Sequence, residues 1–203
     1  MKLYNTVGPN PRMVRMFAAE RGVPLELIRV DLRNAENRRE PYIEKNPSGT
    51  TPALELDDGT VLAEITAICE YLDEIAPGPS LIGSSPEERA ITRMWTRRID
   101  HGICENLVNG YRFTEGLPIF ESRMRCIPEA GPALKLIVQE KLAWLDGLME
   151  GCPYICGERF SMADIMLFAF LDFGTKINQA FDPDLSRIPT WFAEMAARPS
   201  AAA

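Results

Sequence analysis

The sequence contains a single histidine among 203 residues, and none of its five cysteines forms a CxxC pair. A structural zinc site needs about four ligands, usually Cys and His at paired spacing, so we expect no metal site. Cys152 and Cys156 are separated by three residues, whereas a redox-active pair is separated by two. An odd number of cysteines favours free thiols, and we therefore expect a cytoplasmic protein.

The sequence also lacks any apolar run of 18 residues, so we expect no membrane-spanning helix. Its first residues, MKLYNTVGPNP, contain no apolar run after the lysine and do not resemble a secretory signal. The net charge of −7 argues against nucleic acid or an anionic membrane surface as a partner. With 46% hydrophobic and 25% charged residues, the composition is that of an ordinary globular protein with one large or two small domains.

The first eighty residues alternate between strand and helix patterns. Pro11 suits the first turn of a helix, and Gly22 is a typical stop signal. The sequence Asp57-Asp58-Gly59 favours a tight hairpin turn between two short strands. The predicted elements are a strand at 2–5, a helix through 11–21, a strand at 25–30, a polar segment at 34–45, hairpin strands at 52–56 and 60–62, and a helix at 64–75.

The rest of the chain has only helical periodicity. Pro and Gly in the stretch 76–80 indicate a linker. We predict an α/β domain at 1–76, a linker at 77–85 and an all-helical domain at 86–203. The predicted helices of the second domain are 86–112, 132–149, 161–177 and 189–197.

A proline-containing motif precedes the predicted hairpin. The segment reads NPSGTTPAL at 46–54, followed by DDGTVLAE at 57–64, and it resembles the glutathione transferase motif NPxGxxPxL…DGxxLxE. The resemblance implies a cis peptide bond before Pro52 and a glutathione-binding role for Thr51, whose backbone would pair with the cysteinyl part of glutathione. Judged on the residues alone, a trans proline ahead of an edge strand is favoured.

A second motif begins the third predicted helix, where EITAICEYL at 64–72 is similar to the ESxAIxxYL helix of the same family. The γ-glutamyl end of glutathione carries an ammonium and a carboxylate. Glu64 could accept the ammonium, and the N–H of Ile65 at the helix start could bind the carboxylate. Ile65 replaces the usual serine, so backbone donors or Thr66 must substitute for the hydroxyl. The alternative is that Glu64 only complements the helix dipole.

A third motif, GERFSMAD at 157–164, is close to the family pattern GxxFSxAD. Ser161 and Asp164 have the spacing of a helix capping box. The resemblance thus covers nearly the whole chain. It implies an α+β thioredoxin-like N-terminal domain followed by an all-α C-terminal helical bundle, usually assembled as a homodimer.

The start of the first predicted helix lacks the usual residue that activates the thiol. Glutathione transferases use a thiolate, and a free thiol has a pKa of about 8.5, so the site must lower it. The family usually places Tyr, Ser or Cys near the start of the first helix, but the alignment puts Gly8 and Pro11 there. The sequence is similar to the fungal and bacterial branch with a GPxP turn, in which the helix N-terminus and an ordered water would stabilise the thiolate. Our catalytic candidates are Asn10 and the N–H of Arg12, with Thr6 behind them.

The remaining candidate residues have equally good structural explanations. Arg39 stands where the family often binds the glycine carboxylate, although a surface arginine explains it as well. Tyr111 and Phe113 could line an apolar pocket for the second substrate and Arg112 could orient a water, but aromatic residues near a helix end are commonly packing residues. We expect His101 to be structural.

The predicted function is a glutathione transferase that conjugates glutathione, as co-substrate, to small hydrophobic electrophiles or uses it to reduce peroxides. The alternative is a non-catalytic member of the fold that binds glutathione or an apolar ligand. A thiol–disulfide reductase would need a cysteine near residues 8–11, and Pro11 occupies that position.

Overall fold

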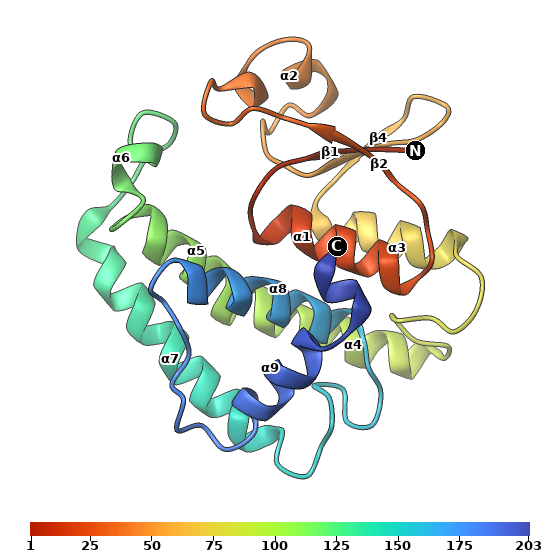
Figure 1. The fold of residues 1–203 in the computed structure, drawn as a ribbon, viewed down its shortest axis with the longest axis vertical. Coiled ribbons are helices and arrows are strands. Elements are labelled where there is room, and N and C mark those ends of the chain that lie inside the picture. The colour runs from red at the N-terminus through yellow and green to blue at the C-terminus, as the bar shows by residue number, and fades with distance from the viewer. The chain divides into compact units, whose positions relative to one another are not determined.

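The computed structural model describes residues 1–203, and the chain forms two compact units (Figure 1). The first unit contains Met1–Ile82 together with Pro199–Ala203, and the second contains Gly83–Arg198. The last five residues therefore group with the first unit, whereas the sequence pattern places them in the helical domain. The physical reason is a contact with the first helix, where the Arg12 guanidinium donates to the Ala201 carbonyl at 3.0 Å.

The first unit is built on a mixed four-stranded sheet with the order β2-β1-β3-β4. β1 and β2 are parallel, and β3 is antiparallel to both β1 and β4, so Leu3 lies opposite Leu27 on one side and Leu54 on the other. This confirms the predicted β-α-β and β-β-α order. The strands are β1 (Lys2–Asn5), β2 (Glu26–Arg29), β3 (Ala53–Glu55) and β4 (Val61–Ala63).

Helices cover both faces of this sheet, with α1 and α3 side by side on one face and α2 on the other (Figure 1). α1 begins at Pro9, where the missing N–H has no helical acceptor in any case. It ends before Gly22, whose φ of 66° is the left-handed conformation that closes many helices. The helical segments are α1 (Pro9–Glu20), η1 (Glu36–Arg38), α2 (Tyr42–Lys45) and α3 (Ile65–Ile75).

A buried ion pair holds the segment that follows α3 against the first unit. Arg21 Nε lies 2.8 Å from Asp73 Oδ1, and the two side chains are 4% and 6% exposed. Arg21 also donates to the carbonyls of Ala76, at 3.1 Å, and Pro79. Asp73 in turn accepts the Leu81 N–H at 2.9 Å. The segment predicted as a linker is therefore held against the first unit by two buried, opposite charges.

The second unit is all helical, as predicted. The predicted helix over 86–112 is divided by a π-helical turn at Asp100–Cys104, and the short α6 was not predicted. None of the helices combines the length and apolar composition that a bilayer crossing needs. The helices are α4 (Pro86–Ile99), α5 (Glu105–Arg112), α6 (Leu117–Phe120), α7 (Gly131–Leu148), α8 (Met162–Lys176) and α9 (Ile188–Ala196), with the short turns η3 (Pro128–Ala130) and, in the first unit, η4 (Pro199–Ala202).

The predicted capping box starts α8, the most buried helix of this unit. Asp164 is fully buried, and its Oδ2 accepts the Ser161 N–H at 3.0 Å. Its Oδ1 accepts the Ile155 N–H at 3.0 Å and the Trp191 indole N–H at 3.2 Å. Burial raises the pKa of Asp164 to about 6, against the lowering effect of these donors. One carboxyl group therefore joins the helix start, the preceding loop and α9.

Candidate functional site

Two loops of the first unit bring predicted residues together. Thr6 lies in the connection from β1 to α1, and its hydroxyl oxygen is 3.3 Å from that of Thr51, which precedes β3. The Thr51–Pro52 bond is cis, as the motif implies. The start of α1, three residues after Thr6, thus belongs to the same group of loops as the proline motif.

Thr51 offers an unpaired backbone edge. Neither its N–H nor its carbonyl is hydrogen-bonded, although the loop around it is firmly held. The preceding Thr50 carbonyl accepts the Asn46 amide at 2.9 Å and the Tyr42 hydroxyl. An adjacent free donor and acceptor on an ordered backbone are what an extended peptide needs for strand-like pairing. Thr51 can therefore bind a short peptide through its main chain.

The same loop explains the glycine of the motif. Gly49 has a φ of 61°, and a Cβ there would lie 2.9 Å from the Asn37 carbonyl oxygen, so a side chain does not fit. Asn37 Nδ2 donates to the Gly49 carbonyl at 2.6 Å, which ties η1 to the motif loop. Arg39 follows η1 and is exposed, with no partner for its guanidinium. This arginine is free to bind an anion, and its predicted role stays a prediction.

Glu64 and the start of α3 form a second set of unpaired groups. Glu64 is the N-cap residue, with a φ of 68°, which is uncommon outside glycine. Its side chain is exposed and has no hydrogen-bonding or ionic partner. The N–H groups of Ile65 and Thr66 lie in the first helical turn, where no carbonyl is available to them, and none outside the helix takes them. An acceptor for an ammonium thus stands beside donors for a carboxylate.

The start of α1 has few unpaired donors. Pro9 and Pro11 carry no N–H, and the Arg12 N–H already donates to the Gly8 carbonyl at 3.3 Å. Arg12 is the fourth residue of the helix and its N–H makes the first helical hydrogen bond, so its predicted role at a thiolate stays a prediction. Asn10 is left with an unpaired N–H, and its side-chain amide has no partner either.

Sequence reasoning missed Arg15 and Asn5 beside this helix start. The Arg15 guanidinium donates to Asn5 Oδ1, at the end of β1. Burial lowers the pKa of Arg15, and the neighbouring charge of Arg12 lowers it further. The sequence gives no sign of this contact, because nothing local connects Arg15 with Asn5.

The three predicted residues of the helical unit lie at the end of α5, and they are packed. The Tyr111 ring meets Phe173 and Phe120 edge to face, with centroids 5.8 and 6.2 Å away. Phe113 is 9% exposed. Arg112 donates to Asn109 and lies over Phe120, and burial lowers its pKa. These contacts give all three a packing role and leave the substrate role a prediction.

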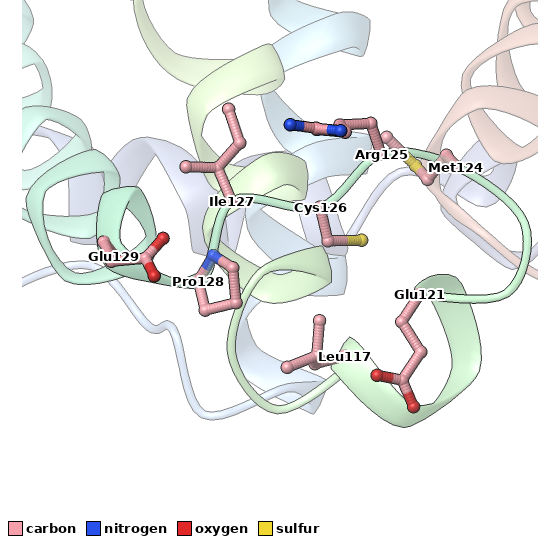
Figure 2. A pocket seen from close by; sticks show the side chains of 8 residues that line it. All are labelled: Leu117, Glu121, Met124, Arg125, Cys126, Ile127, Pro128 and Glu129. Carbon is pink, nitrogen blue, oxygen red and sulfur yellow. The ribbon is translucent and has the colours of Figure 1, made fainter.

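A pocket of about 490 Å³ is formed by α6, η3 and the loop that joins them (Figure 2). Figure 2 shows the Cys126 side chain on the loop that lies above Leu117 and Glu121. The residues Tyr111, Arg112 and Phe113 are not part of its lining. The pocket escaped the sequence analysis because its loop has no periodic pattern. The lining consists of Leu117, Glu121, Met124, Arg125, Cys126, Ile127, Pro128 and Glu129.

Comparison with known proteins agrees with this geometry. Residues 7–75 match the family "Glutathione S-transferase, N-terminal domain", and residues 129–199 match "Glutathione S-transferase, C-terminal domain". Glutathione S-transferase 2 of Saccharomyces cerevisiae is 31% identical over 98% of this chain and 87% of its own length. This chain belongs to the glutathione S-transferase family. The curated relatives named glutathione S-transferase identify it as an enzyme, and the predicted thioredoxin-like domain followed by a helical domain is the glutathione S-transferase fold.

Solved structures of the glutathione S-transferase family have the same fold. A glutathione S-transferase domain-containing protein from Marinobacter aquaeolei is 38% identical, with a TM-score of 0.93 and coverage of 98% of this chain and 99% of its own. The structure of Gtt2 from Saccharomyces cerevisiae is 32% identical, also with a TM-score of 0.93, and covers 100% of this chain and 99% of its own. The similarity therefore extends through both units rather than resting on one domain.

Proposed function

We propose that this glutathione S-transferase binds glutathione on the unpaired groups of its first unit. The observation that carries the proposal is that Thr51, Glu64 and the first turn of α3 all present free donors or acceptors. The γ-glutamyl ammonium meets Glu64, and its carboxylate meets the N–H groups of Ile65 and Thr66. The cysteinyl backbone pairs with Thr51, and the glycine carboxylate meets Arg39.

The thiol is activated without a Tyr, Ser or Cys residue at the helix start. Gly8, Pro9 and Pro11 carry no side-chain donor, which supports a place in the branch that lacks the usual catalytic residue. Asn10 offers both an N–H and an amide, and the positive end of α1 favours an anion there. Thr6, whose hydroxyl contacts that of Thr51, supports these donors, and an ordered water also stabilises the thiolate.

The reaction is attack of the thiolate on a small hydrophobic electrophile, which forms a carbon–sulfur bond and expels a leaving group with its electron pair. This is the chemistry of detoxification. With a peroxide instead, two glutathione molecules supply two electrons and two protons, giving a disulfide, an alcohol and water. Tyr111, Arg112 and Phe113 are the proposed second-substrate residues in the helical unit.

Steady-state assays with glutathione and either an aryl halide or an organic hydroperoxide test this function. If the protein is active and the Asn10→Ala change lowers kcat about tenfold or more, the result supports thiol activation at the start of α1. Binding of glutathione without turnover of either substrate would favour the non-catalytic alternative. That alternative has one specific observation in its favour, the absence of a side-chain donor at positions 8, 9 and 11.

We also propose that the protein is a homodimer. Exposed apolar side chains gather on α4 and α7, where Met94 is 40%, Trp144 46% and Leu148 51% exposed. The Trp95 and Trp144 rings, 6.0 Å apart, connect the two helices. A surface of this kind is usually covered by a partner. Trp144→Glu should give a monomer by light scattering, whereas Ile127→Glu, an exposed apolar residue outside this face, should not.

All five cysteines are free thiols, which supports the proposed cytoplasmic location.

A further inference from the structure

The charges of α1 run against its helix dipole. A helix is stabilised by acidic residues near its N-terminus and basic residues near its C-terminus. α1 has no acidic residue in its first turn and no basic residue in its last. Its arginines, Arg12 and Arg15, lie in the first two turns instead, and Glu20 is its last residue. This order costs helix stability and concentrates positive potential at the end where the thiol is proposed to lie.

Of the two arginines, Arg15 is the one that is half-buried without an acidic partner. A half-buried guanidinium normally has an acidic partner, because removing a charge from water is costly. The only hydrogen-bond partner of Arg15 is the neutral side chain of Asn5. Since Asn5 ends β1 and Arg15 lies in the second turn of α1, this bond also closes the chain around the turn that carries Thr6 and Gly8.

No other charge in the first unit neutralises Arg15. The one charged neighbour that changes the pKa of Arg15 is Arg12, also a cation. Asp73 on α3 is paired with Arg21, and Lys2 in the sheet is paired with Glu55. The other charged residues on the elements packed against α1 are Glu70 and Glu74 on α3, and η4 has none.

We propose that Arg15 supplies the positive charge that stabilises the glutathione thiolate, and that Asn5 is the positioning residue that holds this charge without neutralising it. The inference rests on the proposed glutathione site at the start of α1. Arg15 acts through its field and does not touch the sulfur. The positive charge of Arg15, in the second turn of α1, thus compensates for the missing hydroxyl or thiol donor.

Asn5→Asp tests the proposal most directly, because it keeps a hydrogen-bond acceptor for Arg15 but adds a neutralising charge. The pKa of bound glutathione is measured from the ultraviolet absorbance of the thiolate as a function of pH, with binding followed by calorimetry. We expect Asn5→Asp and Arg15→Gln each to raise the thiol pKa by about one unit, which is a roughly tenfold loss of thiolate at a pH below both pKa values. Arg15→Lys should keep the thiol pKa near that of the unaltered protein, and Arg33→Gln, an exposed arginine, is the control.

A purely structural role gives a different pattern. Asn5→Asp would then leave the thiol pKa unchanged, and Arg15→Lys would raise the thiol pKa as much as Arg15→Gln does. Either result overturns the inference. If Arg15→Gln does not fold, Asn5→Asp and Arg15→Lys still decide it. If the unaltered protein does not bind glutathione, the proposed function fails, and with it the basis of the inference.

Discussion

Breaking the Arg21–Asp73 pair should be among the most destabilising single changes in the first unit. Asp73→Asn keeps an oxygen that can accept the Leu81 N–H but leaves the Arg21 charge, 4% exposed, without an opposite charge. Removing one partner of a buried ion pair typically costs about 3–5 kcal/mol, because the remaining charge stays out of water. We therefore expect a loss of about 3 kcal/mol or more in the free energy of unfolding.

Urea unfolding followed by circular dichroism measures this change. Lys176→Met is the matched control, because it breaks a pair with Asp172 in which the lysine is 60% exposed, and it should cost about 0.5 kcal/mol or less. The double variant Arg21→Met/Asp73→Leu should recover more than half of the loss, since no buried charge is left unpaired. A loss below about 1 kcal/mol in Asp73→Asn, or no recovery in the double variant, would refute the reasoning.

Two further predictions concern single side chains. The folded-state pKa of Asp164 is about 6, above its unfolded value of about 3.8, so its contribution to stability is present below pH 4 and is lost as the pH rises through 6. The free energy of unfolding should therefore fall by about 3 kcal/mol between these pH values relative to Asp164→Asn, and equal pH slopes in urea titrations would contradict the assignment. Ile65→Ser restores the family hydroxyl at the start of α3 and should tighten glutathione binding about three- to tenfold by calorimetry. Unchanged affinity would mean that the backbone donors there already satisfy the carboxylate.

The elements that could be predicted are those whose signals are local. Gly22 ended α1, the Asp57-Asp58-Gly59 turn made the hairpin, and the spacing of Ser161 and Asp164 marked the start of α8. The π-helical turn was not predictable, because it does not alter the helical period. It is stabilised by Asn106, whose amide donates to the carbonyls of His101 and Gly102 at 2.9 and 3.0 Å.

The features that escaped prediction depend on contacts between distant residues. The C-terminal segment joins the first unit through Arg12 and Ala201, which are 189 residues apart, and through Glu20 and Ser200. Within the candidate site, the motifs predicted the cis bond before Pro52 and the helix start after Glu64. They could not show that the Arg12 N–H is already bonded, because this depends on the residue at which α1 begins.

Calorimetric titration of reduced glutathione tests the central claim most directly. The unaltered protein should bind with a saturable isotherm, and Glu64→Gln should bind about 10- to 100-fold more weakly, since a charged hydrogen bond to the ammonium is lost. Glu74→Gln, an exposed residue on the same helix, is the matched control and should bind like the unaltered protein. No binding by the unaltered protein, or equal affinity in Glu64→Gln, would contradict the proposed glutathione site.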